Sequence, residues 1–184
     1  MKQKFFLLLL ICIFAASASF SQMSTNRVVV ANGGAYSDPD DFVTLTAFDP
    51  STGETQQLAT IFTQSVQGLL VHEGAAWVAA QDSLAVIDLS NGNRLAVVEL
   101  AGVNKFALWQ DQLLVSRQYP VTGDFVQVRD AATLELIKSF SQVSDEAWEI
   151  TVTADTAYVS VAGGWAATEG KLAVIDLNSM NFVR

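Results

Sequence analysis

The amino-acid sequence predicts an all-β fold, a β-propeller built of four-stranded antiparallel blades. The first observation is a phrase that recurs four times, a short apolar run followed by an aspartate and a polar turn, with the aspartates at Asp49, Asp88, Asp130 and Asp176. The second is their spacing, which is 39, 42 and 46 residues. A repeat of about 40 residues that contains only strands and turns is typical of propeller blades.

The start of the chain is predicted to be a signal peptide over residues 1–21, with the propeller over residues 22–184. A positively charged start precedes the apolar run Phe5–Ala16, and small residues follow it, which is the order of a secretory signal. The run is shorter than the ~20 apolar residues of a spanning helix, so cleavage after Ser21 is favoured over an uncleaved anchor. We expect no membrane span after cleavage.

The only cysteine, Cys12, lies inside this leader. The mature chain would then contain no cysteine, and export without disulfides is more typical of a bacterial envelope protein than of a small secreted animal domain. We therefore predict an extracytoplasmic location, in the periplasm, on the cell surface or secreted.

The first repeat predicts three strands, over Arg27–Ala31, Phe42–Asp49 and Thr55–Phe62, because these runs are rich in β-branched and aromatic residues. In the turn between the last two strands, Pro50 fixes φ and Gly53 tolerates a positive φ. No innermost strand is predicted before Arg27.

The second and third repeats each predict four strands. Several of these runs are apolar at successive positions, as in LAVID and AAWVAA, which is expected of strands whose two faces are both buried between neighbouring blades. The predicted strands are Gly68–Val71, Ala76–Ala80, Leu84–Asp88 and Arg94–Leu100, and then Lys105–Trp109, Gln112–Arg117, Phe125–Arg129 and Leu136–Phe140.

The fourth repeat predicts strands over Trp148–Val152, Ala157–Val161 and Leu172–Asp176, and residues 181–184 begin a further one. The chain thus carries about four blades. We expect them to be part of a larger ring of six to eight blades and of a longer reading frame; a closed four-blade ring is the alternative.

The four recurring aspartates are interpreted as structural turn residues. Each stands at the end of a strand, where a carboxylate can accept hydrogen bonds from the backbone N–H groups of the following turn. The chain carries 10 basic and 19 acidic residues, and loss of Lys2 and Lys4 with the leader takes the net charge from −9 to −11. Such an acidic charge balance disfavours the binding of nucleic acid and is compatible with the binding of cations, neutral glycans and basic peptides.

The predicted binding face is the one on which the connections between the second and third strands of each blade gather. Three of these connections are long, 32–41, 117–124 and 162–170, and each carries an aromatic residue that could stack on a sugar ring or a peptide side chain. The predicted ligand-binding residues are Tyr36, Asp38, Asp40, Arg117, Tyr119 and Trp165. Arg117 has two interpretations, a long side chain packed along the surface and a clamp for a carboxylate.

No metal, cofactor or catalytic residue is assigned. Asp38, Asp40 and Asp41 form the densest acidic cluster and are a weak candidate for calcium, although a solvated loop of Asx-turns is favoured. The single histidine, His72, is interpreted as a turn residue, because one histidine beside one glutamate makes neither a zinc site nor a triad. Trp148 is expected to pack between blades, and lining of the channel mouth is the alternative.

The repeats SLAVIDLSNGNRLAVVEL and KLAVIDLNSMNFV resemble the blades of YVTN-type, YncE-like propellers, which are extracytoplasmic proteins of bacteria and archaea, including cell-surface proteins of Bacteroidetes. The resemblance covers Arg27–Arg184 and rests on blade-forming residues, so it implies the architecture. Some proteins of this fold bind metals, nucleic acid or quinone cofactors, and no motif here carries any of these over.

The sequence therefore predicts an exported, non-enzymatic β-propeller, a scaffold that binds a glycan, a peptide or a surface protein at the bacterial cell envelope. The alternative is an enzyme acting on glycans or lactones through channel carboxylates, for which Asp145, Glu146, Glu149 and Glu169 are eligible by residue type. A purely structural surface protein is the third possibility.

Overall fold

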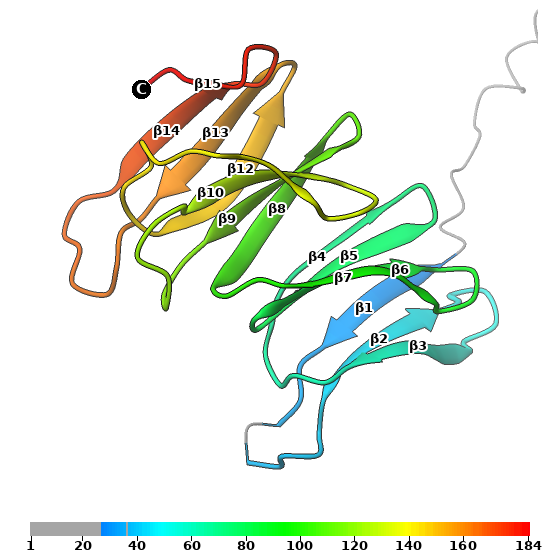
Figure 1. The fold of residues 1–184 in the computed structure, drawn as a ribbon. Helices are drawn as coiled ribbons and strands as arrows, with labels where there is room; N and C mark the ends of the chain where they lie inside the picture. Colours follow the sequence, from blue (N-terminus) through cyan, green and yellow to red (C-terminus); the bar gives the residue numbers. More distant parts are fainter. Residues whose placement is uncertain (1–26, 36) are drawn as a thin grey trace, which may run out of the picture.

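The computed structural model describes residues 27–35 and 37–184, and within this part the chain contains strands and turns but no helix. The strands form one three-stranded and three four-stranded antiparallel sheets, set side by side like the blades of a fan (Figure 1). The predicted all-β class and the blade-like sheets are thus confirmed. The predicted leader, residues 1–21, lies outside the described residues.

Each repeat of the sequence forms one sheet, in which the strands lie in chain order. The first sheet contains β1 (Val28–Asn32), β2 (Val43–Phe48) and β3 (Thr55–Ile61). The second contains β4 (Val66–His72), β5 (Ala75–Ala80), β6 (Ser83–Asp88) and β7 (Arg94–Glu99). The third contains β8 (Val103–Trp109), β9 (Gln112–Arg117), β10 (Val126–Asp130) and β11 (Leu136–Ser139). The fourth contains β12 (Ala147–Thr153), β13 (Thr156–Val161), β14 (Lys171–Asp176) and β15 (Asn181–Phe182).

Neighbouring sheets pack face to face, and the inner strands β4, β8 and β12 lie next to one another. The core consists of one apolar cluster in each of the three spaces between sheets. In β6, Ala85 and Ile87 contact the first sheet, whereas Leu84 and Val86 contact the third. Both faces of the strand are therefore buried, which explains why its apolar residues stand at successive positions.

The inner strands are longer than predicted, because each contains a β-bulge. The register against the second strand shifts between Val66 and Gly68 in β4, between Val103 and Phe106 in β8, and between Ala147 and Ile150 in β12. An extra residue in one strand breaks the alternation of inward and outward side chains. A prediction based on alternation therefore begins these strands one or two residues late.

The turns that follow β2, β6, β10 and β14, each beginning at one of the recurring aspartates, repeat the same geometry. The fourth residue after the aspartate has a positive φ in all four sheets, at Gly53, Gly92, Leu134 and Met180. In the first three sheets the N–H of this residue donates to the carbonyl of the aspartate over 2.8–2.9 Å. The turn is thus defined by hydrogen bonds and backbone conformation that tolerate several residue types.

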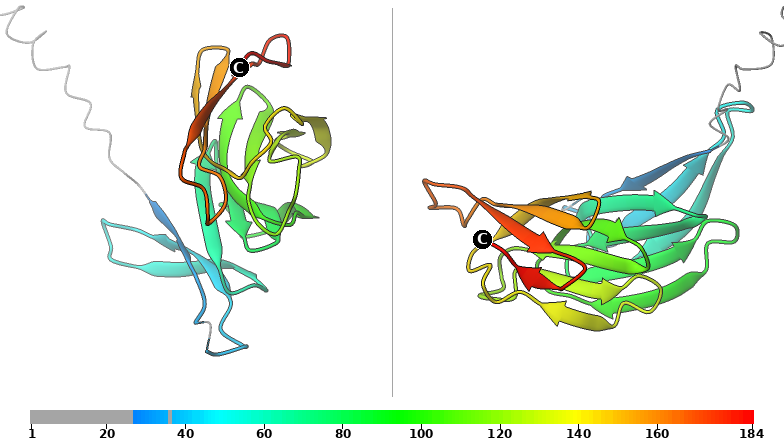
Figure 2. Two further views of the ribbon diagram at one scale, coloured as in Figure 1. Left: turned by 90° about the vertical axis from the view of Figure 1, so that its left-hand side faces the viewer. Right: turned by 90° about the horizontal axis from the view of Figure 1, so that it is seen from above.

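The first and fourth sheets lie at opposite ends of the fan in Figure 1 and in both views of Figure 2. The described sheets form an open arc and not the closed four-blade ring that was the alternative. The size of a complete ring stays a prediction.

Candidate functional site: an aromatic groove between the third and fourth sheets

Two of the predicted binding residues, Tyr119 and Trp165, line one open groove of about 640 Å³. Tyr119 belongs to the loop between β9 and β10, and Trp165 to the loop between β13 and β14. Trp148, in β12, joins them from the inner strand of the fourth sheet. We call this the aromatic groove; its lining is completed by Gln118, Glu146, Ala162, Gly163 and Gly164.

The aromatic side chains of the groove are open to solvent. Trp165 is fully exposed, Tyr119 is 78% exposed and Trp148 is 46% exposed. Aromatic rings are usually buried in a fold of this kind, because they contribute much of the hydrophobic stabilisation. Three exposed rings around one hollow mark a surface suited to binding.

The Trp165 loop is tied to the strand that carries Trp148. The Gly163 N–H donates to the Glu146 carbonyl over 3.2 Å, and the Ala167 N–H donates to the Gly164 carbonyl over 2.8 Å. Gly163 has φ +76°, and a Cβ there would lie 2.6 Å from the Cβ of Ala167. Glycine is required at this position because a side chain would be strained by the backbone and would collide with the loop.

Two carboxylates border the groove. A Cβ built on Gly164 would lie 3.1 Å from Glu146 Oε1, and one built on Gly163 would lie 3.3 Å from Asp145 Oδ2, so both acids stand against the Trp165 loop. Asp145 Oδ1 accepts a hydrogen bond of 2.9 Å from the Glu146 N–H. No basic residue lines the groove. The described groove thus combines aromatic faces with negative charge.

Arg117 is committed to backbone carbonyls. Its Nε donates to the Ala101 carbonyl over 3.0 Å and its guanidinium also donates to the Asp124 carbonyl over 3.4 Å. Burial lowers the pKa of Arg117, and the nearby Asp124 opposes this effect. These contacts fit the first interpretation of Arg117, a side chain packed along the protein, and they hold the base of the loop that carries Tyr119.

The acidic part of the predicted site lies elsewhere. Asp38 and Asp40 belong to the loop between β1 and β2, in the sheet at the other end of the arc (Figure 1). Asp38 Oδ1 accepts a hydrogen bond of 3.0 Å from the Asp40 N–H, and Asp41 Oδ2 accepts one of 2.8 Å from the Ala35 N–H. These are local turn contacts. Tyr36 lies outside the described residues.

The carboxylates of the weak calcium candidate make contacts within their own loop. Among the residues that it describes, no group of three or more His, Cys, Asp or Glu side chains could hold a metal ion. The carboxylates of Asp38 and Asp41 are instead directed to backbone N–H groups of their own loop. His72 ends β4, is exposed, and lies 3.6 Å from the carboxylate of the adjacent Glu73.

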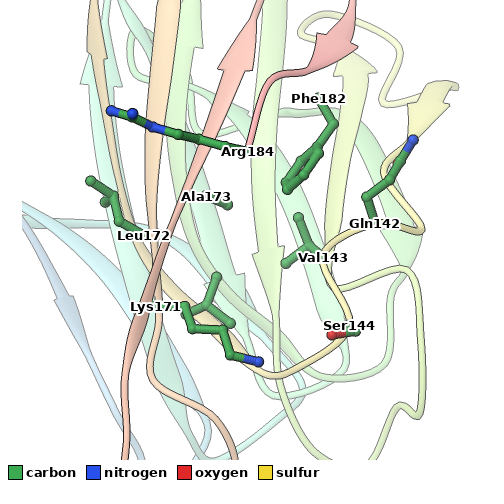
Figure 3. Close-up of a pocket in the computed structure, with 9 residues that line it drawn as sticks. Gln142, Val143, Ser144, Lys171, Leu172, Ala173, Phe182 and Arg184 are labelled. Atoms are coloured by element: carbon green, nitrogen blue, oxygen red, sulfur yellow. The ribbon is translucent and has the colours of Figure 1, made fainter.

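A second, smaller cavity of about 140 Å³ lies beside β14 and β15. Figure 3 shows Phe182 and Val143 pointing into the same space, whereas the Arg184 side chain is directed away from it. Ligand sites usually occupy at least ~300 Å³, so this cavity is small for a ligand, and the aromatic groove is the better candidate.

The groove contains two residues, Trp148 and Glu146, that are not among the predicted ligand-binding residues. The sequence favours packing between blades for Trp148, whereas its exposure and its position in the groove favour the alternative, lining. Glu146 was eligible only by residue type. Both stand where β12 begins, directly after the connection from the third sheet, and this position at the entrance of an inner strand was the available signal.

Comparison with known proteins gives a likeness of fold. No protein-family model and no curated protein matches the chain. Among solved structures, the computationally designed Ika4 protein superposes with a TM-score of 0.61 at 18% identity, over 84% of this chain and 88% of Ika4. BamB from Moraxella catarrhalis superposes with a TM-score of 0.59 at 14% sequence identity, over 87% of this chain and 49% of BamB.

The dihydro-heme d1 dehydrogenase NirN gives a TM-score of 0.58 at 17% identity, over 84% of this chain and 37% of NirN. The chain therefore spans about half or less of the length of BamB and NirN. Likeness at these identities concerns architecture alone. No helix in the described residues is long and apolar enough to cross a membrane. By its fold, with four radial antiparallel sheets and these structural neighbours, the chain is a β-propeller.

Proposed function

We propose that this propeller is an exported, non-enzymatic scaffold that binds a ligand in the aromatic groove. The observation that carries the proposal is the gathering of Tyr119, Trp148 and Trp165 around one open hollow, from two adjacent sheets. Repeat folds acquire binding sites by varying loops on a regular framework, and these loops are the long ones of the predicted binding face.

The chemistry of the groove favours a glycan or a basic peptide. Exposed aromatic faces stack on the apolar faces of sugar rings and attract cationic side chains. Glu146 supplies a negative charge, and the whole chain has a net charge of −9. The same charge disfavours nucleic acid, which selects clusters of Lys and Arg.

The location of the protein and its relation to YVTN-type, YncE-like propellers are parts of the same proposal. They are supported by the leader-like residues 1–21, by the absence of cysteine after Cys12, and by the recurring VID phrase. We place the protein at the bacterial cell envelope or surface.

Arrays of glycans and of lysine-rich peptides test the proposal. We expect the exported full chain to retain a subset of array members, and we expect the double variant Tyr119→Ala, Trp165→Ala to lose them at least tenfold with an unchanged melting temperature, because both side chains are exposed. The matched control is Leu95→Ala, Val97→Ala, which removes exposed apolar groups from β7. Binding that survives in the groove variant, or that falls equally in the control, contradicts the site.

The enzymatic alternative depends on the two carboxylates beside the groove. Asp145 and Glu146 lie against the Trp165 loop, beside the aromatic groove. Hydrolysis of nitrophenyl glycosides or of simple lactones, abolished by Glu146→Gln with array binding retained, would establish an enzyme and overturn the non-enzymatic assignment.

A further inference from the structure

The outward face of the fourth sheet carries residues that the same repeat buries elsewhere. Counted back from the turn aspartates, Leu172 corresponds to Leu84 and Tyr158 corresponds to Trp77, since Tyr158 pairs with Val174 as Trp77 pairs with Val86. Leu84 is fully buried against the third sheet, whereas Leu172 is 56% exposed. The fourth sheet thus presents a blade-packing surface that nothing covers among the described residues.

The first sheet presents the opposite surface. Val28 pairs with Phe48 and Val30 pairs with Thr46, which places Val30 at the position of Val78 in the second sheet. Val78 is fully buried by the first sheet, whereas Val30 is 40% exposed. The outward face of the first sheet is therefore the kind of face that a preceding blade packs against.

The first face is free of charge, and the central part of the second is neutral and partly apolar. The register places Val28, Val30, Asn32, Thr44, Thr46 and Phe48 on the first face. It places Thr151, Tyr158, Ser160, Leu172 and Val174 on the second. Charged residues stand at the borders of the second face. Asp176 accepts a hydrogen bond from the Ser179 N–H in its own turn, and Glu149 adjoins Ser160 near the start of β12. Arg184 extends to the Leu172 side of β14 (Figure 3). A neutral first face, and a second face that is partly apolar between its charged borders, indicate two surfaces suited to burial at the ends of the arc.

We infer that the outward face of the fourth sheet binds the outward face of the first sheet of a second copy of this chain. The described sheets contain both halves of one blade-to-blade interface, so a head-to-tail contact reproduces the packing already present between them. Such heterologous contacts form closed rings when the rotation closes. Two copies bring eight sheets together, four from each, which is the upper end of the usual four to eight blades.

Two single substitutions at exposed positions test the assembly. The exported full chain at 1–100 µM is expected to have twice the mass of one chain by light scattering. Leu172→Asp and Val30→Asp should each raise the dimer Kd at least about 100-fold, because each places an unpaired charge in an apolar interface. Leu95→Asp, on the exposed face of β7, is the control and should remain dimeric.

Mixing the two variants tests the head-to-tail geometry. Leu172→Asp keeps an intact first face and Val30→Asp keeps an intact fourth face, so the mixture should regain dimer mass through one native interface, although each variant alone is monomeric. A monomeric wild-type chain overturns the proposal. So does a Val30→Asp variant that dimerises alone, since this would mean pairing of two fourth sheets. Array binding by the groove is measured separately, so the two proposals fail independently.

Discussion

At the scale of the residue, the turn aspartates show how one side chain defines a repeat. The Asp88 carboxylate accepts hydrogen bonds from the Ser90 N–H and hydroxyl over 2.7 and 2.6 Å, and Asp49 does the same with Ser51. The side-chain hydrogen bond is the largest cause that lowers the pKa of each. For Asp130 the pKa is lowered first by the Thr133 N–H.

Because the pKa values of these aspartates are lowered in the folded state, the stability of the protein depends on pH. A carboxylate with a lower pKa in the folded state stabilises the protein above its unfolded pKa, and this contribution is lost as the pH falls through the folded value. We expect the melting temperature to drop below about pH 4, and we expect a smaller drop in Asp88→Asn, which has no such proton to gain. Glu99→Gln is the control for the change in net charge, and an equal reduction in both variants would contradict the prediction.

A second residue-scale prediction concerns positive φ. Gln110 adopts φ 54° in the turn between β8 and β9, and Leu134 adopts φ 63°. Left-handed conformations cost non-glycine residues about 1–2 kcal/mol, so Gln110→Gly should raise the free energy of unfolding by roughly 1 kcal/mol. Leu134→Gly should lower it by about 2–4 kcal/mol, because Leu134 is buried. Urea unfolding measures both, and destabilisation by Gln110→Gly would contradict the argument.

At the scale of the element, the close approach of the inner strands depends on glycine. A Cβ on Gly68 would lie 3.2 Å from the Asn104 carbonyl oxygen and 3.3 Å from the Phe106 ring. Gly68→Val should therefore push β4 away from β8 and destabilise the protein by about 1–3 kcal/mol. Gly123→Ala, where a Cβ would meet nothing within 4 Å, is the control and should be neutral. Equal unfolding midpoints for the two variants would show that the sheets can move apart freely.

The elements were predictable where composition alone decides them. Runs such as Ala76–Ala80 and Leu84–Asp88 are dense in apolar residues that favour strands between two layers. The bulges at the start of β4, β8 and β12 could not be predicted from composition, because they depend on the register with a neighbouring strand. The buried pair Arg129 and Gln127 could not be predicted from composition either. The Arg129 guanidinium donates two hydrogen bonds to Gln127 Oε1, over 2.8 and 3.0 Å, and both residues are buried.

At the scale of the whole molecule, the candidate site depends on which sheets are neighbours. The sequence identified Tyr119 and Trp165 as aromatics of long loops, and their meeting in one groove follows because the third and fourth sheets are adjacent. Asp38 and Asp40 were grouped with them on one face, but the first sheet is separated from the groove by the other sheets of the arc. The sequence indicates which loops are long, but it contains no information on the distances between them.

The four tryptophans of the chain fall into two groups whose fluorescence reports on different parts of the molecule. The Trp77 Nε1 donates to the Ala131 carbonyl of the next sheet over 2.8 Å and is buried, and the Trp109 Nε1 donates to Asp155 over 3.3 Å. Trp148 and Trp165 are open to a quencher. Acrylamide should therefore quench Trp148 and Trp165 first and leave a blue-shifted emission from the buried Trp77, which is lost only when the sheets separate. Occupancy of the groove and integrity of the fold can then be followed in one cuvette without any label.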